Sequence, residues 1–130
     1  MVGAGSVFGA LPDGDPVRIG VYDYAARAVF DRASLGDRPV LLTGFVIEGA
    51  GGQRYLARVV VECCAADGRP VKVGLAGDLP ADLEADLWLE VEGTYVDYAD
   101  RDPVNGGLIP YLRVTSVRPI PAPTDPYESR

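Results

Sequence analysis

The distribution of apolar and polar positions predicts a chain built mostly from β-strands. Apolar runs of strand length recur after residue 39, and each is bounded by Gly, Pro, Asp or Asn. Leu87, Leu89 and Val91 alternate with Trp88 and Glu90, which is the pattern of a half-buried strand. We expect five strands, at residues 40–47, 55–65, 69–75, 87–95 and 108–117.

Two segments have helical rather than strand patterning. A short strand, Ile19–Val21, precedes Asp23, a suitable N-cap for a helix that ends near Ala33. One side of this helix carries a stripe that predicts a packing surface, formed by Tyr22, Ala25, Ala26, Val29, Phe30 and Ala33. Residues 81–86 predict a short helical turn between the third and fourth strands.

The second and third strands form a predicted hairpin, because Asp67-Gly68 between β-rich runs is a strong turn signal. A two-residue loop there would place Glu62 among apolar side chains. A three-residue loop, residues 66–68, makes one face apolar and sets Glu62 opposite Lys72. We therefore predict the second register, which pairs Cys63 with Val71, Val61 with Val73 and Val59 with Leu75.

Five strands with a short helix between the third and fourth follow the order of the oligonucleotide/oligosaccharide-binding (OB) fold, a five-stranded Greek-key barrel. The predicted fold is mainly β, an OB-like barrel with an N-terminal helix. Residues 18–120 form this domain, residues 1–17 are a flexible linker rich in small residues, and residues 121–130 form an extended Pro-rich tail.

Composition narrows the possible functions. The 130-residue chain has a net charge of −7 and no basic cluster, so we expect no nucleic-acid partner. It has no histidine, which excludes a Ser-His-Asp triad, and it has no phosphate-binding glycine motif. We predict that it is not an enzyme and has no catalytic residues. No apolar run reaches the ~20 residues of a membrane helix, so we expect the chain to be soluble as given.

Two adjacent cysteines form the first candidate site. Cys63, Cys64 and Asp67 offer two thiolates and a carboxylate within five residues, a set that suits zinc or copper(I). Strand alternation, however, directs Cys63 into the core and Cys64 outward. The alternative is a buried structural cysteine at position 63, with Asp67 as a turn former. Zinc is the candidate cofactor only if the three residues form a metal site.

Exposed strand faces form a second candidate site. Arg54 and Arg58 are predicted to lie on the outward face of the second strand with Leu56 and Val60, an arrangement that suits the docking of an acidic peptide or another domain. Trp88 lies between acidic neighbours, and an outward Trp often marks a contact surface. Solvated faces, or a Trp88 turned into the core by a bulge, are the alternatives.

Several motifs carry a family resemblance. They are T-G-F-V (43–46), R-x-x-x-x-C-C-A-A-D (58–67), D-L-W-L-E-V-x-G-T (86–94), I-P-Y (109–111) and A-P-T-D-P-Y (122–127). Over roughly residues 17–128 the chain resembles the soluble C-terminal domain of a bacterial family of membrane proteins of unknown function, described as permease subunits. D-Y-A-A-R-A-V and D-P-V-N-G-G resemble its actinobacterial branch.

The resemblance implies membrane helices preceding this chain and a larger membrane permease subunit as the partner. It places the intact protein in the cell membrane and this domain outside the cytoplasm. It also adds modest support for metal binding at Cys63, Cys64 and Asp67, because the family is loosely associated with metal homeostasis. The alternatives are a free-standing OB module for single-stranded nucleic acid or sugar, and a thiol-redox domain with one exposed, low-pKa cysteine.

Overall fold

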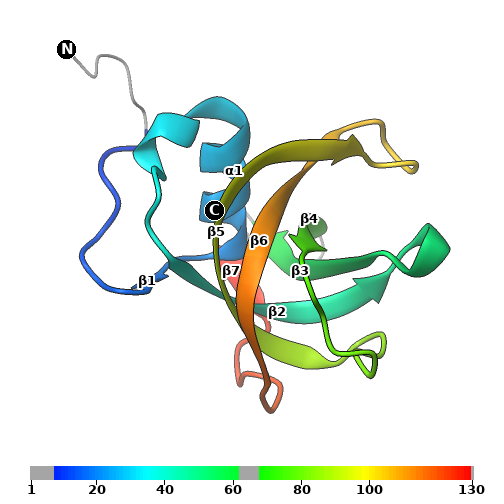
Figure 1. Ribbon diagram of the computed structural model, residues 1–130. Coiled ribbons are helices and arrows are strands. Elements are labelled where there is room, and N and C mark those ends of the chain that lie inside the picture. Colours follow the sequence, from blue (N-terminus) through cyan, green and yellow to red (C-terminus); the bar gives the residue numbers. More distant parts are fainter. Residues whose placement is uncertain (1–7, 62–67, 130) are drawn as a thin grey trace.

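The computed structural model describes residues 8–61 and 68–129, and within them five strands close a barrel (Figure 1). Antiparallel pairing joins β2 to β3, β3 to β4, β5 to β6 and β5 to β2, and a parallel pair joins β4 to β6. The predicted mainly β class with five barrel strands is therefore confirmed. The strands are β2 Val40–Glu48, β3 Arg54–Val61, β4 Arg69–Ala76, β5 Trp88–Arg101 and β6 Leu108–Pro119.

Period-2 alternation builds the barrel interior. Side chains of β2 and of the first part of β5 alternate between buried and partly exposed, as the sequence predicts for β5, and Leu42, Leu89 and Val91 are fully buried. Gly44 is needed where β2 crosses β3, because a Cβ there would lie 2.5 Å from the carbonyl oxygen of Ala57. Strand β5 is longer than predicted and carries irregularities in its pairing with β6.

Helix α1, Val21–Phe30, packs against the barrel (Figure 1). The Tyr24 hydroxyl is buried and donates a hydrogen bond to the Tyr111 carbonyl at 2.8 Å, and burial raises the pKa of Tyr24. The predicted boundaries differ. The helix begins at Val21 after Gly20 and ends at Phe30, and Asp23 lies inside its first turn, paired with Arg27.

The predicted helix stripe is only partly correct, because Ala25 is buried as predicted but the other positions of the stripe are not. The side chains of α1 buried against the barrel include Val21, Tyr24 and Ala28, whereas Phe30 is 79% exposed and Val29 is 36% exposed. Both sides of this helix are rich in Ala, Val and aromatic residues, so the local pattern does not decide which side is covered.

The predicted hairpin register is also wrong. Val73 pairs with Leu56 and Val71 pairs with Arg58, rather than with Val61 and Cys63. Leu56 and Val60 are consequently buried instead of lying outward, and Lys72 lies opposite Ala57. The predicted loop, residues 66–68, lies largely outside the described residues, as do residues 62–65.

The connection between β4 and β5 contains turns rather than the predicted short helix. Residues 77–87 adopt bends and turns, and Arg54 on β3 donates a hydrogen bond to the Leu83 carbonyl. The predicted A-D-L-E-A-D turn is too short to hold a helix without its own packing face.

Segments at both ends of the described chain lie against the barrel. The short first strand, β1, covers Val17–Arg18 rather than the predicted Ile19–Val21. It pairs in parallel with β2. Residues 8–16, predicted as part of a linker, contribute the buried side chain of Leu11. Strand β7, Tyr127–Ser129, pairs in parallel with β3, so part of the predicted Pro-rich tail joins the sheet. Figure 1 shows it in red beside the barrel.

Candidate functional site

Arg58 fastens the C-terminal segment to the barrel. Its Nε donates a hydrogen bond to the Pro126 carbonyl at 2.8 Å, and its Nη2 donates to the Asp125 carbonyl at 2.9 Å. Its Nη1 donates to the Thr43 carbonyl on β2 at 3.1 Å. Only 12% of the Arg58 side chain is exposed, so most of its hydrogen-bonding capacity is used inside the protein. We call Arg58, Trp88, Asp125, Pro126 and Glu128 the tail clamp.

Trp88 packs in the same place. The Arg58 guanidinium lies 5.3 Å from the centre of the Trp88 ring, and Trp88 packs at 5.4 Å, with a tilt of 58°, against Phe45 on β2. Such cation–π and aromatic contacts contribute on the order of 0.5–1.5 kcal/mol each. The structure therefore brings together two of the predicted partner-binding residues, and their contacts are with the rest of this chain.

Glu128 completes the clamp by capping a distant helix. Its carboxylate accepts hydrogen bonds from the backbone N–H groups of Val21, at 2.8 Å, and Tyr22, at 3.0 Å, and lies 3.9 Å from Arg58. Helix α1 has no capping side chain at Gly20, so this remote carboxylate serves the positive end of the helix dipole. The sequence analysis did not single out Glu128; the only signal near it was the D-P-Y motif at residues 125–127.

Arg54 holds different loops. Its Nε donates to the Leu83 carbonyl at 2.8 Å, its Nη1 donates to the Gly52 carbonyl at 2.9 Å, and its Nη2 lies 3.8 Å from Glu48. It is not part of the tail clamp, although the sequence grouped it with Arg58.

The proposed metal ligands Cys63, Cys64 and Asp67 lie outside the described residues. Among residues 8–61 and 68–129, no group of three or more His, Cys, Asp or Glu side chains could hold a metal ion.

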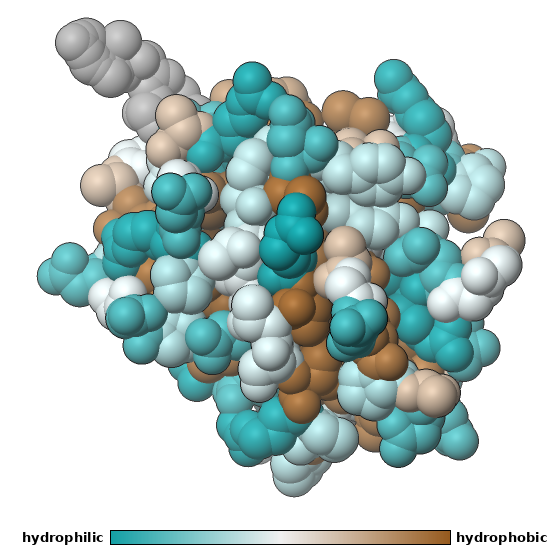
Figure 2. Space-filling view, viewed as in Figure 1, coloured by the Kyte–Doolittle hydropathy of each residue, from teal (hydrophilic) through white to brown (hydrophobic). Residues whose placement is uncertain are grey.

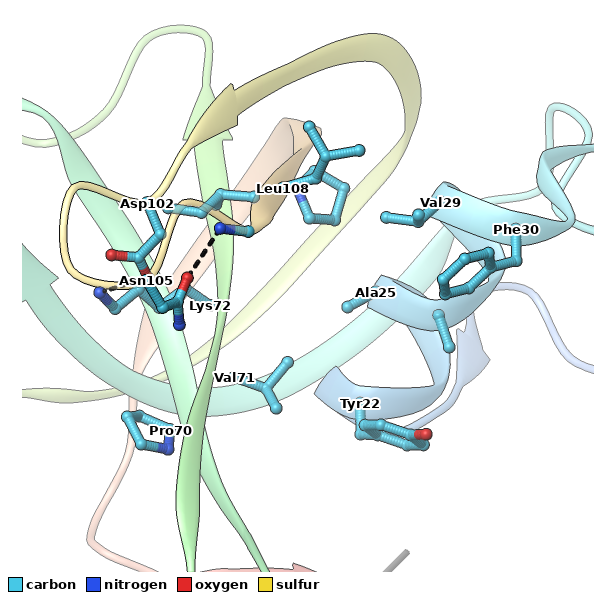
Figure 3. Close-up of a pocket in the computed structure, with 14 residues that line it drawn as sticks. Tyr22, Ala25, Val29, Phe30, Pro70, Val71, Lys72, Asp102, Asn105 and Leu108 are labelled. Carbon is cyan, nitrogen blue, oxygen red and sulfur yellow. Dashed lines mark hydrogen bonds and ion pairs between the residues drawn. The ribbon is translucent and has the colours of Figure 1, made fainter.

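A groove along α1 carries the exposed part of the helix stripe. Two hollows of about 250 and 470 Å³ share Val29, Phe30, Leu108 and Pro110 as lining residues. Phe30 is 79% exposed and Leu108 is 48% exposed. Figure 3 shows Val29 and Phe30 on the helix facing Leu108 across the first hollow. We call this surface, between α1 and the start of β6, the helix groove.

On the face shown in Figure 2, which has the orientation of Figure 1, hydrophobic residues lie between hydrophilic ones. The helix groove is bordered by side chains that are large, apolar and adjacent, a combination that often marks an interaction site.

A buried ion pair lies at one edge of the helix groove. Lys72 on β4 contacts Asp102 at 3.0 Å (Figure 3), and their side chains are 17% and 10% exposed. The other carboxylate oxygen of Asp102 accepts a hydrogen bond from the Val104 N–H at 2.9 Å. That backbone bond, followed by the Lys72 contact, holds the pKa of Asp102 below its usual range. Asp102 thereby fixes the loop between β5 and β6.

The fold and the groove define a small closed β-barrel domain with one helix and an uncovered apolar groove beside that helix. A family model, the DUF1980 C-terminal domain, matches residues 32–128. The chain belongs to this family, whose function is not defined.

Other comparisons add little. No curated protein matches the chain. One solved structure, a crystal structure of a putative aspartyl-tRNA synthetase from Leishmania major Friedlin, is similar at 15% identity with a TM-score of 0.44. The match covers 85% of this chain and 22% of that one, so the chain spans about a fifth of that protein. No helix among the described residues is long and apolar enough to span a membrane.

Proposed function

We propose that this chain is the non-catalytic docking domain of a membrane-anchored, permease-type subunit, and that the helix groove binds the larger membrane subunit. The observation that carries the proposal is the group of neighbouring exposed apolar side chains at the groove, led by Phe30 and Leu108.

These side chains have the properties of docking residues. Phe30 ends α1 and Leu108 begins β6, so both project from rigid elements. Fully burying a side chain of this type is worth roughly 1.5–3 kcal/mol, and interface energy concentrates in a few such anchors. A partner that covers both would gain affinity at little cost in loop ordering.

Charge indicates the chemistry of the bound segment. The chain carries a net charge of −7. Arg32 and Lys72, which line the two hollows, already contact Asp97, at 3.2 Å, and Asp102, at 3.0 Å. We therefore expect a segment with apolar anchors and flanking Lys or Arg residues, because a second copy of this chain would bring the same negative charge.

The family assignment supports the wider context of the proposal. The strand order β2-β3-β4-β6-β5, with β4 and β6 parallel, favours classification as an OB-like Greek-key barrel. The sequence motifs resemble those of a bacterial family of membrane proteins and its actinobacterial branch, and this resemblance favours a location at the cell membrane with this domain outside the cytoplasm.

Co-purification with the larger membrane subunit tests the docking function. The intact protein would be co-expressed with that subunit, with and without the double substitution Phe30→Ser/Leu108→Ser. We expect the double variant to lose about tenfold or more of the co-purified subunit. Val104→Ser is the matched control, because Val104 is 84% exposed but lies outside the helix groove. Undiminished co-purification by a folded double variant would contradict the proposal.

Soft-metal binding at Cys63, Cys64 and Asp67 is the second candidate function, and the C-C-A-A-D motif supports it. Native mass spectrometry of the reduced chain with added zinc would test it. One retained zinc on the parent chain and none on Cys63→Ser/Cys64→Ser would establish a metal site. Zinc retained by neither chain would leave the cysteines structural, and rapid alkylation of Cys64 would then favour a thiol-redox role.

A further inference from the structure

The C-terminal segment, residues 121–129, is held to the barrel at a few points rather than along its whole length. None of these nine residues is buried. Its strand, β7, pairs with β3 over three residues, and Arg58 donates hydrogen bonds to two of its carbonyl groups. A hollow of about 400 Å³ lies beside it, with Pro123 and Glu128 in its lining. A segment with so few buried contacts can open locally while the barrel stays folded.

Glu128 connects this segment to α1. Its carboxylate accepts hydrogen bonds from the backbone N–H groups of Val21, at 2.8 Å, and Tyr22, at 3.0 Å. The fit is close, because a Cβ at Gly20 would lie 2.9 Å from Oε1 of Glu128. Gly20 has an ordinary extended backbone, with φ −76°, so its missing side chain makes room for the carboxylate. The first turn of α1 is therefore shaped to receive a carboxylate from β7.

Helix α1 connects the Glu128 contact to the helix groove. The helix has ten residues and is about 15 Å long, with the carboxylate at its first turn and Phe30 at its last. The Tyr24 hydroxyl fixes its middle to the barrel by donating to the Tyr111 carbonyl. Arg27 donates to two carbonyl groups of the segment before β1, which is not part of a barrel strand. The direction of the helix, and with it the position of Phe30, consequently depends on how the first turn is held.

The shape of the helix groove depends on that direction. Val29 and Phe30 project from α1, and Leu108 projects from β6 (Figure 3). Packed helices shift as units, so a tilt at the first turn is carried to the last. Such a tilt changes the spacing of Phe30 and Leu108, the two anchors that a partner has to cover together.

We propose that the C-terminal segment regulates docking at the helix groove, with Glu128 as a positioning residue that acts through α1. While the segment lies on β3, Glu128 fixes the helix and the groove has the shape that binds the larger membrane subunit. When the segment leaves β3, the cap is lost and the groove binds that subunit more weakly. This inference rests on the proposed docking function. Couplings between two such sites typically change affinity about 5–150-fold.

Two substitutions in different segments test the coupling. Glu128→Ala removes the carboxylate, and Gly20→Ala displaces it by placing a Cβ in its position. We expect both to shift the NMR signals of the Val29 and Leu108 methyl groups in the full chain, because the Phe30 ring moves relative to them. Both should also lower co-purification of the larger membrane subunit by the intact protein about fivefold. Glu128→Gln should have an intermediate effect, because its amide oxygen still accepts a hydrogen bond.

Ser129→Ala is the matched control, because Ser129 is an exposed residue of the same strand, and it should equal the parent in both measurements. Methyl signals unchanged in folded Glu128→Ala and Gly20→Ala chains would overturn the proposal. So would normal co-purification by both variants when Phe30→Ser/Leu108→Ser loses the subunit. If that double variant co-purifies normally while the methyl signals of both cap variants shift, the docking function is wrong and control of the groove by the segment is supported.

Discussion

The tail clamp and the helix groove show opposite uses of similar side chains. At the tail clamp, Arg58 holds the C-terminal segment and lies against the Trp88 ring, and its guanidinium donates hydrogen bonds to three carbonyl groups of the same chain. At the helix groove, Phe30 and Leu108 remain 79% and 48% exposed. The polar groups of the tail clamp are hydrogen-bonded within this chain, whereas the helix groove exposes apolar side chains that a partner could cover.

This contrast changes where a partner should be sought. The sequence directed attention to Arg58 and Trp88, because Arg and Trp are enriched in interface hot spots. The structure shows that Arg58 binds the chain's own C-terminal segment and that Trp88 packs against Arg58 and Phe45. The better docking candidates are Phe30, on a helix stripe that the sequence assigned to packing, and Leu108 at the start of β6.

Arg58→Ala should cause the largest loss of stability. The substitution removes three hydrogen bonds and the contact with Trp88, so we expect a loss of roughly 3 kcal/mol in the free energy of unfolding. Arg58→Lys should recover only part of it, because an ammonium cannot reproduce the guanidinium fork. Urea denaturation measures both.

Arg113→Ala is the control for this prediction, since Arg113 is exposed. An Arg58→Ala chain as stable as this control would mean that the tail clamp contributes nothing to stability.

A smaller effect is expected from Glu128→Ala. Removing the carboxylate leaves the N–H groups of Val21 and Tyr22 without their cap, at a cost of about 1–2 kcal/mol. Hydrogen exchange should show faster opening of α1 than of the β5–β6 pair. Equal acceleration throughout the barrel would show that Glu128 does not act through the helix.

Acidification should reveal a further, modest contribution from Asp102. Its pKa is lowered in the folded chain, so it stabilises the fold above its unfolded pKa of about 3.9 and this contribution is lost as pH falls through the lower folded value. Glu90, whose pKa is lowered first by the hydrogen bond from Arg118, acts in the same direction. The free energy of unfolding should therefore decline below about pH 4.

Asp102→Asn should reduce this decline, as followed by urea denaturation at several acidic pH values. Asp37→Asn, at an exposed position, serves as the comparison. Identical pH slopes for the two variants would show that Asp102 does not contribute.

The smallest effect on stability should come from Phe30→Ser. Because Phe30 is largely exposed, we expect a change within about 0.5 kcal/mol in the free energy of unfolding. This small change, together with lost co-purification of the membrane subunit, would separate binding from folding most clearly. A large loss of stability would instead assign Phe30 a role in the fold.

The sequence by itself determined the barrel strands. In β5, the alternation of Leu89 and Val91 with Trp88 and Glu90 predicted one buried face, and Leu89 and Val91 are fully buried, because the two-residue period is a local property of the chain.

Tertiary structure alone decided the hairpin register, the buried side of α1 and the tail clamp. In β3 both faces carry apolar residues, so burial of Leu56 and Val60 depends on what packs against them. Arg58 acts on backbone carbonyls, which every residue possesses and which therefore leave no signature in the sequence. The helix groove exists because the barrel covers one side of α1 and leaves Phe30 beside Leu108, a relation between segments 78 positions apart.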